Sequence, residues 1–203
     1  MIGILRAGAA EQERRRPCSE GDVSDLPTFH TGRLVVRPRV MADLDACLAM
    51  DRDPEVTRFV AGPWDDPARH EAFVRERIAA DFGRGLGYWS VFDRHAPHCF
   101  LGWVLLIPCD GNGPDIEIGW RFVRRAWGRG YATEAALPVV AHAFGTLGLG
   151  RIVAGIAPGN EGSMNVARKI GMRRSGPSAG AETETEAEVE ALFVMTRADH
   201  EVF

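Results

Sequence analysis

The stretch at residues 125–132 reads RAWGRGYA and joins an apolar, strand-like run to a run with helical spacing. Its glycines, Gly128 and Gly130, lack the β-carbons that would keep an anion away from the backbone. The helix that follows directs unpaired N–H groups and the positive end of its dipole at the same turn. The stretch therefore predicts a phosphate-binding loop at a strand–helix junction.

The two commonest nucleotide-binding patterns do not fit this loop. The chain has no G-x-x-x-x-G-K-[ST] sequence, and its only lysine, Lys169, lies far downstream. A dinucleotide-binding turn has G-x-G-x-x-G in the first strand–turn–helix unit of the fold, whereas this turn lies past the middle of the chain and lacks the third glycine. The phosphate therefore belongs to a different kind of ligand.

The loop has the pattern [QR]-x-x-G-x-[GA] and resembles the acetyl-coenzyme A (acetyl-CoA) pyrophosphate loop of the GNAT acetyltransferases. Further blocks match the order and spacing of one branch of that superfamily, the ribosomal-protein-alanine acetyltransferase-like proteins: residues 31–38 (TGRLVVRP), 116–120 (IEIGW), 127–135 (WGRGYATEA), 158–163 (PGNEGS) and 169–172 (KIGM). The resemblance extends from about Thr31 to the C-terminus. It implies an N-acetyltransferase with acetyl-CoA as its cosubstrate.

Length and composition favour a single domain. The chain has 203 residues, of which 45% are hydrophobic. This is enough for one well-buried core, and the chain is short for two domains. Residues 1–27 are polar, mixed in charge and without periodicity, which predicts a flexible N-terminal arm; an inert tail and a start codon placed too early are the alternatives. We expect residues 28–203 to form one N-acetyltransferase domain.

Net charge and cysteine spacing argue against several classes of binding partner and against a metal site. A net charge of −4 and a pI near 5.9 argue against a nucleic-acid or membrane-surface binder, which would need a basic face. Cysteines 18, 47, 99 and 109 show no C-x-x-C pairing and no histidine at ligand spacing, and no apolar run is long enough to span a membrane. We therefore expect a cytoplasmic protein without a metal, either a monomer or a homodimer.

Local patterns predict alternating strands and helices of an α/β (α+β) fold. Aspartate is favoured at a helix N-cap and proline at the first helical position, so Asp66 and Pro67 predict the start of a helix. Pro138 should kink its helix or remove a hydrogen bond. Gly171 should adopt a left-handed conformation at the end of a helix. Strands are expected at 33–37, 86–92, 99–107, 115–123, 151–157, around Met172 and at 191–196, and helices at 43–50, 54–60, 67–82, 131–147 and 161–170.

The resemblance to GNAT proteins predicts how these strands and helices are arranged. It implies a central mixed, mostly antiparallel sheet of six to seven strands with helices on both faces. It also implies that strand 115–123 splays from strand 151–157, and that the pantetheine arm of the cosubstrate threads between them.

Cosubstrate anchoring is expected along the loop and at a second helix start. Backbone N–H groups between Arg125 and Ala132 would bind the pyrophosphate, and the side chains of Arg125 and Arg129 would add charge-assisted contacts. A tight strand–helix connection with two solvated arginines is the alternative. Asn160 is expected both to cap a helix and to contact the pantetheine amide. The remaining loop residues assigned to binding are Trp127, Gly128, Gly130, Tyr131, for which packing is the main expected role, Ala132 and Thr133.

The resemblance also suggests how the acetyl group would be transferred. Backbone N–H groups of Phe122 and Val123 would stabilise the oxyanion. Glu117 would act as general base, directly or through a water; a half-exposed polar residue or a water chain is the alternative. Many members of the superfamily have a tyrosine near the thioester sulfur, but Ala167 stands at that position here. Ser163 would therefore stabilise or protonate the departing thiolate. A simple first-turn serine is the alternative.

The predicted function is direct transfer of acetyl from acetyl-CoA to a primary amine through a ternary complex. The acceptor is a protein N-terminus or a small amine, and the acidic residues 182–190 would suit a cationic one. Two alternatives remain: a covalent route through Cys109 and a non-catalytic acetyl-CoA-binding regulatory module. Trp64 and Trp89 are candidates for the acceptor pocket, although core packing is the commoner role for such residues.

Overall fold

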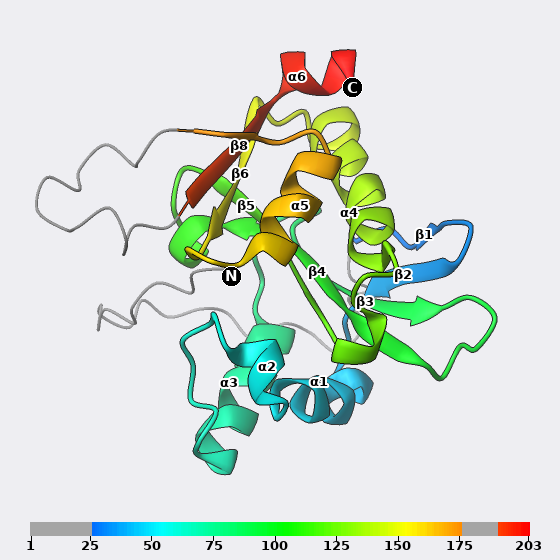
Figure 1. Cartoon of the computed structure of the whole chain (residues 1–203), viewed down its shortest axis with the longest axis vertical. Helices are drawn as coiled ribbons and strands as arrows, with labels where there is room; N and C mark the ends of the chain where they lie inside the picture. Colours follow the sequence, from blue (N-terminus) through cyan, green and yellow to red (C-terminus); the bar gives the residue numbers. More distant parts are fainter. Residues whose placement is uncertain (1–25, 176–190) are drawn as a thin grey trace, which may run out of the picture.

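The computed structural model of the protein describes residues 26–175 and 191–203 (Figure 1). Nearly all of the predicted N-terminal arm, and the acidic residues 182–190, therefore lie outside the described residues. Within the described ranges, no helix combines the length and apolar character that a membrane crossing requires.

One mixed sheet organises the described chain, as predicted. Its eight strands lie in the order β1-β2-β3-β4-β5-β6-β8-β7, and neighbours are antiparallel except β5 and β6, which are parallel. The strands are β1 (Phe29–His30), β2 (Leu34–Pro38), β3 (Gly87–Asp93), β4 (Phe100–Pro108), β5 (Ile116–Phe122), β6 (Arg151–Ile156), β7 (Arg173–Arg174) and β8 (Ala191–Thr196). The count exceeds the predicted six to seven because β1, with only two residues, is too short to show an alternating pattern.

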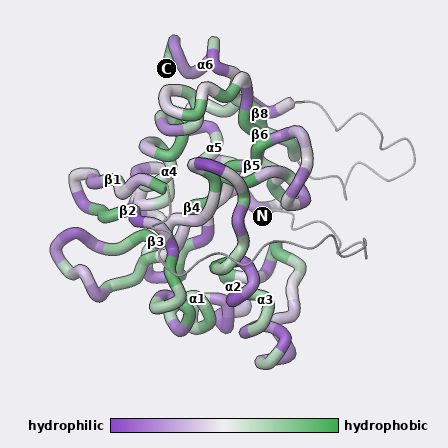
Figure 2. The backbone as a smooth tube through the Cα atoms, turned by 180° about the vertical axis from the view of Figure 1, so that it is seen from behind, coloured by the Kyte–Doolittle hydropathy of each residue, from purple (hydrophilic) through white to green (hydrophobic). Residues whose placement is uncertain are grey.

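Helices cover both faces of this sheet, again as predicted. Neighbouring residues of β4 point to opposite faces, so that Val104 packs into one buried cluster with α4 and α5, and Leu105 packs into another with α1 and α3. The helices are η1 (Met41–Asp43), α1 (Leu44–Asp51), α2 (Pro54–Thr57), α3 (Pro67–Ala79), η2 (Cys109–Gly111), η3 (Arg124–Ala126), α4 (Tyr131–Ala141), the π-helical η4 (His142–Thr146), α5 (Glu161–Lys169) and α6 (Arg197–Val202). Figure 2 shows that the outer turns of the chain are mostly hydrophilic, as expected for this layering.

Local sequence chemistry explains where several helices begin and end. The Asp66 side chain accepts hydrogen bonds from the N–H groups of Ala68 and Arg69, which confirms the predicted N-cap of α3. That helix stops before the predicted residue 82 because the Asp81 carboxylate accepts from the Gly83 N–H at 2.9 Å, a local turn that competes with another helical bond. At the end of α5, Gly171 has φ +92°, and the Met172 N–H donates to the Ala167 carbonyl at 3.0 Å, as expected for a left-handed cap.

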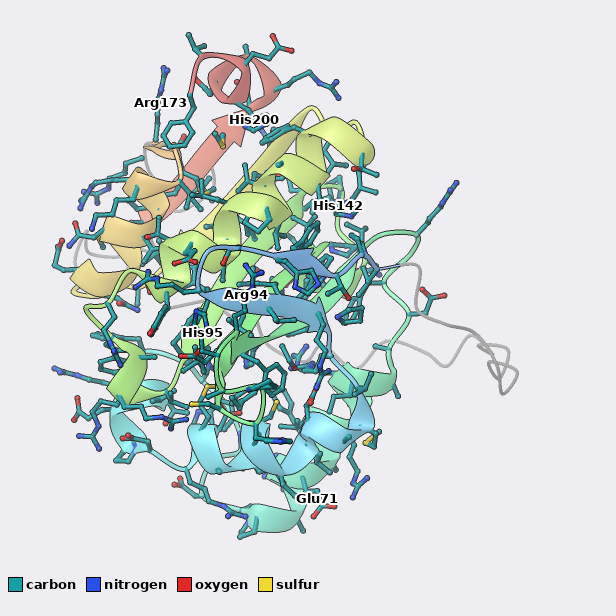
Figure 3. All side chains as sticks on the ribbon, turned by 90° about the vertical axis from the view of Figure 1, so that its right-hand side faces the viewer. Glu71, Arg94, His95, His142, Arg173 and His200 are labelled. Atoms are coloured by element: carbon teal, nitrogen blue, oxygen red, sulfur yellow. The ribbon has the colours of Figure 1, made fainter. Side chains whose placement is uncertain are left out.

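The long helix predicted for residues 131–147 is split. Pro138 lies within α4 and cannot donate to the previous turn, yet the helix continues to Ala141. The chain then widens into a π-turn, in which the Leu147 N–H donates to the His142 carbonyl at 3.0 Å. The buried His142 ring lies 2.9 Å from the Gly85 carbonyl and ties this turn to the loop before β3 (Figure 3).

Candidate active site

The central feature of the site is the separation of β5 from β6. Along its other edge β5 pairs with β4 continuously, from Pro108 opposite Ile116 to Gly102 opposite Phe122. Toward β6, the described residues give one registered pair, Glu117 with Val153. The outer half of β5 therefore presents a backbone edge without a neighbouring strand, at the place where the splay is expected.

A cavity of about 570 Å³ opens at this edge. Its walls come from the end of β5, the loop before α4, the start of α5 and the segment around α2. The lining residues are 55, 56 and 58–60 from the α2 segment, 120–122 from β5, 126–128 and 130–133 from the loop and α4, and 159–163, 165, 166 and 169 from α5 and the turn before it. The cavity thus joins segments that lie more than 100 residues apart in the chain.

Most of the predicted cosubstrate-binding residues meet in this cavity. Those in its lining are Phe122, Trp127, Gly128, Gly130, Tyr131, Ala132, Thr133, Asn160 and Ser163. The lining does not include Glu117, Val123, Arg125 or Arg129. The cavity lining therefore contains most of the predicted loop and the predicted helix start, but neither of the two arginines expected to contact phosphate.

The loop before α4 has the conformation that its glycines allow. Gly128 and Gly130 have φ of +70° and +77°, in the left-handed region that side chains disfavour. A β-carbon on Gly128 would meet no heavy atom within 4 Å, so it would project into open space beside the loop. The first bond of α4 runs from the Glu134 N–H to the Gly130 carbonyl, which leaves the preceding N–H groups without an acceptor inside the helix. A bound anion would satisfy them.

The edge of β5 offers one of the two predicted backbone donors. The Val123 N–H already donates to the Leu101 carbonyl of β4 at 3.0 Å. Successive N–H groups of a strand point to opposite edges, so the Phe122 N–H points away from β4, toward the splay. The Val123 N–H is therefore used within the sheet, whereas the Phe122 N–H is directed to the splayed edge of β5.

Asn160 caps α5, as predicted. Its side-chain oxygen accepts from the Ser163 N–H at 3.1 Å, which leaves its amide NH₂ group as a donor for a ligand. Ser163 lies in the first turn of α5 and contributes to the cavity wall.

The two loop arginines point elsewhere. Arg125 donates to the Phe100 carbonyl of β4 at 2.7 Å, and the Arg129 guanidinium lies over the Tyr131 ring at 5.3 Å from its centroid. Neither side chain lines the cavity, and their contacts with a phosphate stay a prediction. Lys169, the only lysine in the sequence, does line the cavity.

A family model described as an acetyltransferase (GNAT) domain matches residues 33–173. The chain belongs to the GNAT acetyltransferase family. It is an acetyl-CoA-dependent acetyltransferase, and the cavity beside β5 lies within the matched region.

Several known proteins are similar to this GNAT chain. The protein YkkB of Bacillus subtilis is 35% identical over 144 residues, 69% of this chain and 83% of that protein. The FsC-acetyl coenzyme A-N(2)-transacetylase of Aspergillus fumigatus is 32% identical over 136 residues, 63% of this chain and 57% of that protein. A crystal structure of an acetyltransferase from Agrobacterium tumefaciens, 29% identical, superposes with a TM-score of 0.67 and covers 88% of this chain and 99% of its own.

Glu117 of this GNAT chain lies deeper than a direct base requires. Its side chain is 8% exposed, beside the registered pair of β5 and β6. It precedes Trp120, the first cavity residue of β5, by three positions, or roughly 10 Å along a strand. The carboxylate therefore lies away from the residues with which β5 lines the cavity.

A buried ionic group beneath the cavity was missed from the sequence. The Arg121 side chain is 6% exposed and donates to Asp51 at 2.8 Å, and the His70 ring lies 3.4 Å from the other oxygen of the same carboxylate. The Arg121 guanidinium also lies 5.1 Å from the centroids of Trp64 and Trp103. These contacts join residues 51, 70 and 121, which are too far apart in the sequence for a local spacing pattern to predict them.

The two tryptophans proposed for an acceptor pocket pack instead. Trp64 lies against Arg121 and His70, and neither Trp64 nor Trp89 lines the cavity. Trp89 is fully buried and donates to the Pro27 carbonyl at 2.8 Å. Core packing, the alternative stated above, describes Trp89, whereas Trp64 is half-buried and packs against the Arg121 and His70 side chains.

The environment of Cys109 does not suit a covalent route. Burial raises the pKa of its thiol to about 11, and the carboxylates of Glu117 and Asp115 act in the same direction. A thiolate is the nucleophilic form of cysteine, so this thiol is poorly activated. Cys109 also lies outside the residues that line the cavity.

Proposed function

We propose that the protein transfers the acetyl group of acetyl-CoA directly to a primary amine at the splay of β5 and β6, in a ternary complex. The observation that carries this proposal is the cavity itself, which joins the glycine loop, the unpaired edge of β5 and the start of α5. Each of these segments matches one requirement of the reaction.

The glycine loop fits a pyrophosphate. The N–H groups at the start of α4 and the helix dipole favour an anion, and the open space beside Gly128 leaves room for it. Asn160 would donate its amide hydrogens to a pantetheine carbonyl. When bound, acetyl-CoA supplies the thioester that the amine attacks.

Residues of this chain would then stabilise the charges that develop. The Phe122 N–H would donate to the thioester oxygen as it becomes negative; removal of one such donor costs about 10²- to 10³-fold in other enzymes. Ser163 would donate to the departing sulfur at the positive end of α5. Glu117 would take the amine proton through bridging waters, since roughly 10 Å of strand separates it from the first cavity residue of β5.

The acceptor enters from the α2 segment in this proposal, since Glu55, Arg58 and Phe59 also line the cavity. Both acceptor classes stay open: a protein N-terminus, as the ribosomal branch suggests, or a small amine. The name of the Aspergillus relative, a transacetylase acting at N(2), supports transfer to nitrogen. A single domain at 28–203, a cytoplasmic location and a monomer or homodimer complete the proposal.

An amine panel tests this function. The protein is incubated with acetyl-CoA and each amine, including peptides with a free N-terminus, and released thiol is titrated. We expect release that depends on the amine and equals the acetylated product. Thermal stabilisation by acetyl-CoA without thiol release for any amine would contradict the catalytic proposal and favour the regulatory module.

A further inference from the structure

Arg33 and Glu134 form a dense contact between the sheet edge and the first turn of α4. The Arg33 guanidinium lies 2.6 Å from Glu134 Oε2 through Nη2 and 2.7 Å through Nε. The other carboxylate oxygen accepts from the Arg33 backbone N–H at 2.9 Å and from the Thr31 hydroxyl at 2.6 Å. Four donors therefore hold one carboxylate, across 101 residues of sequence.

The same guanidinium also contacts the glycine loop. Its Nη1 donates to the Arg129 carbonyl at 3.0 Å, and its carbon lies 4.5 Å from the centroid of the Tyr131 ring. A β-carbon on Gly130 would lie 3.5 Å from Nη2. Arg33 thus fixes the carbonyl of the residue between the two loop glycines.

This contact resolves an electrostatic conflict at the start of α4. Burial alone would raise the pKa of Glu134, but the hydrogen bonds from Thr31 and Arg33 outweigh it and lower the pKa, so this carboxyl is ionised at neutral pH. A carboxylate in the first turn competes with a phosphate for the same positive helix end. Arg33 cancels that charge and pulls a loop carbonyl away from the anion site.

We propose that Arg33 is a positioning residue that makes the start of α4 receptive to the pyrophosphate by neutralising Glu134 and holding the Arg129 carbonyl. This inference rests on the proposed function of the cavity. It gives a role to the TGRL sequence at 31–34, which lies far from the loop in the chain and beside it in the structure. Figure 3 shows this side of the molecule, where β2 lies next to α4.

The test compares Arg33→Ala, Glu134→Gln and the double variant, with two acetyl donors. Acetyl-CoA carries the pyrophosphate, whereas acetyl-pantetheine ends before it. We expect Arg33→Ala to weaken acetyl-CoA binding about 10-fold, because a negative charge at the helix start is then unopposed. Turnover of acetyl-pantetheine should change less than twofold, and the double variant should recover most of the acetyl-CoA affinity.

Arg94→Ala is the matched control. Arg94 is an exposed arginine on the neighbouring turn (Figure 3). Its side chain donates to the Thr31 carbonyl at 3.0 Å and, among the described residues, forms no ion pair with Glu134 and no hydrogen bond to the loop. Its removal changes the net charge equally and should leave acetyl-CoA affinity unchanged. If Arg33→Ala does not fold, Arg33→Gln takes its place, since glutamine also removes the positive charge and keeps more of the side chain than alanine does.

Two results would overturn the inference. Equal losses with both donors would show a general structural role, and a double variant as weak as Arg33→Ala would show that Arg33 does not act through Glu134. Failure of the proposed function is distinct, because the unaltered protein would then release no thiol from either donor with any amine, whatever the variants bind.

Discussion

The indole nitrogen of Trp127 donates to the backbone carbonyl of Phe122 at 2.7 Å. This bond ties the glycine loop to the outer end of β5, the two parts of the site that hold opposite ends of the cosubstrate in the proposed function. It also occupies a carbonyl that points to the same edge as the Phe122 N–H. An unoccupied carbonyl there would repel a developing oxyanion.

Trp127→Phe should therefore lower kcat more than it weakens acetyl-CoA binding. An aromatic ring is kept, although a smaller one, and one hydrogen bond of about 0.5–1.5 kcal/mol is lost, which corresponds to roughly 2- to 12-fold in rate. Steady-state kinetics and direct binding of CoA measure the two effects. A variant with full kcat and impaired binding would show that Trp127 serves the cosubstrate alone.

Gly128→Glu should abolish acetyl-CoA binding. The residue has φ +70°, and a side chain would project into the open space beside the loop with a negative charge. Gly145→Glu is the matched control, because Gly145 also has open space around it, lies outside the cavity and has no left-handed φ. Calorimetric titration with CoA measures both variants, and similar binding by the two would contradict the assigned loop.

Glu117→Gln should slow turnover by about 10²-fold at neutral pH and leave acetyl-CoA affinity unchanged, as expected on removal of a general base. The substitution keeps the shape of a side chain that is 8% exposed. Kinetics over a pH range with parallel binding measurements separate the two effects. Unchanged kcat, or an equal loss of binding, would remove Glu117 from the base role.

Asp51→Asn should destabilise the fold by about 3–5 kcal/mol, because it leaves the Arg121 guanidinium buried without its counter-ion. Asp53→Asn is the comparison: Asp53 pairs with the exposed Arg124 and caps α2, a task that asparagine also performs, so its loss should cost about 0–1 kcal/mol. Urea unfolding gives both values. Equal stabilities of the two variants would show that the buried pair contributes little.

Cys109 should resist alkylation in the native protein. Its pKa is raised from 9.0 to about 11, so at pH 8 the thiolate fraction is lower than that of an unperturbed thiol by roughly 100-fold. The folded state binds this proton more tightly, so the contribution to stability is full below pH 9 and is lost as pH rises toward 11. Mass-resolved iodoacetamide labelling, with and without urea, measures the difference, and equal native and unfolded rates would contradict it.

Sequence patterns predicted the features that depend on neighbouring residues. The N-caps at Asp66 and Asn160 and the left-handed Gly171 follow from side-chain chemistry within one helical turn, and the structure has all three. The glycine loop is another local feature, and its residues do meet in one cavity. The splay of β5 from β6 came from the family resemblance, because periodicity says nothing about which strands pair.

Contacts between distant segments explain what was missed. The pairs Arg121–Asp51 and Arg33–Glu134 join residues 70 and 101 positions apart, so no spacing rule reveals them. Arg125 was expected at the phosphate from its place in the motif, yet its side chain satisfies a carbonyl of β4. A motif fixes the backbone of such a loop more firmly than the direction of its long side chains.

The most direct test of the central claim is the initial-velocity pattern with acetyl-CoA and an active amine varied together. Direct transfer requires both substrates on the protein at once, so double-reciprocal lines should intersect, and acetyl-CoA alone should leave the protein unacetylated by mass. Parallel lines, with an acetyl group on the protein before the amine is added, would contradict direct transfer.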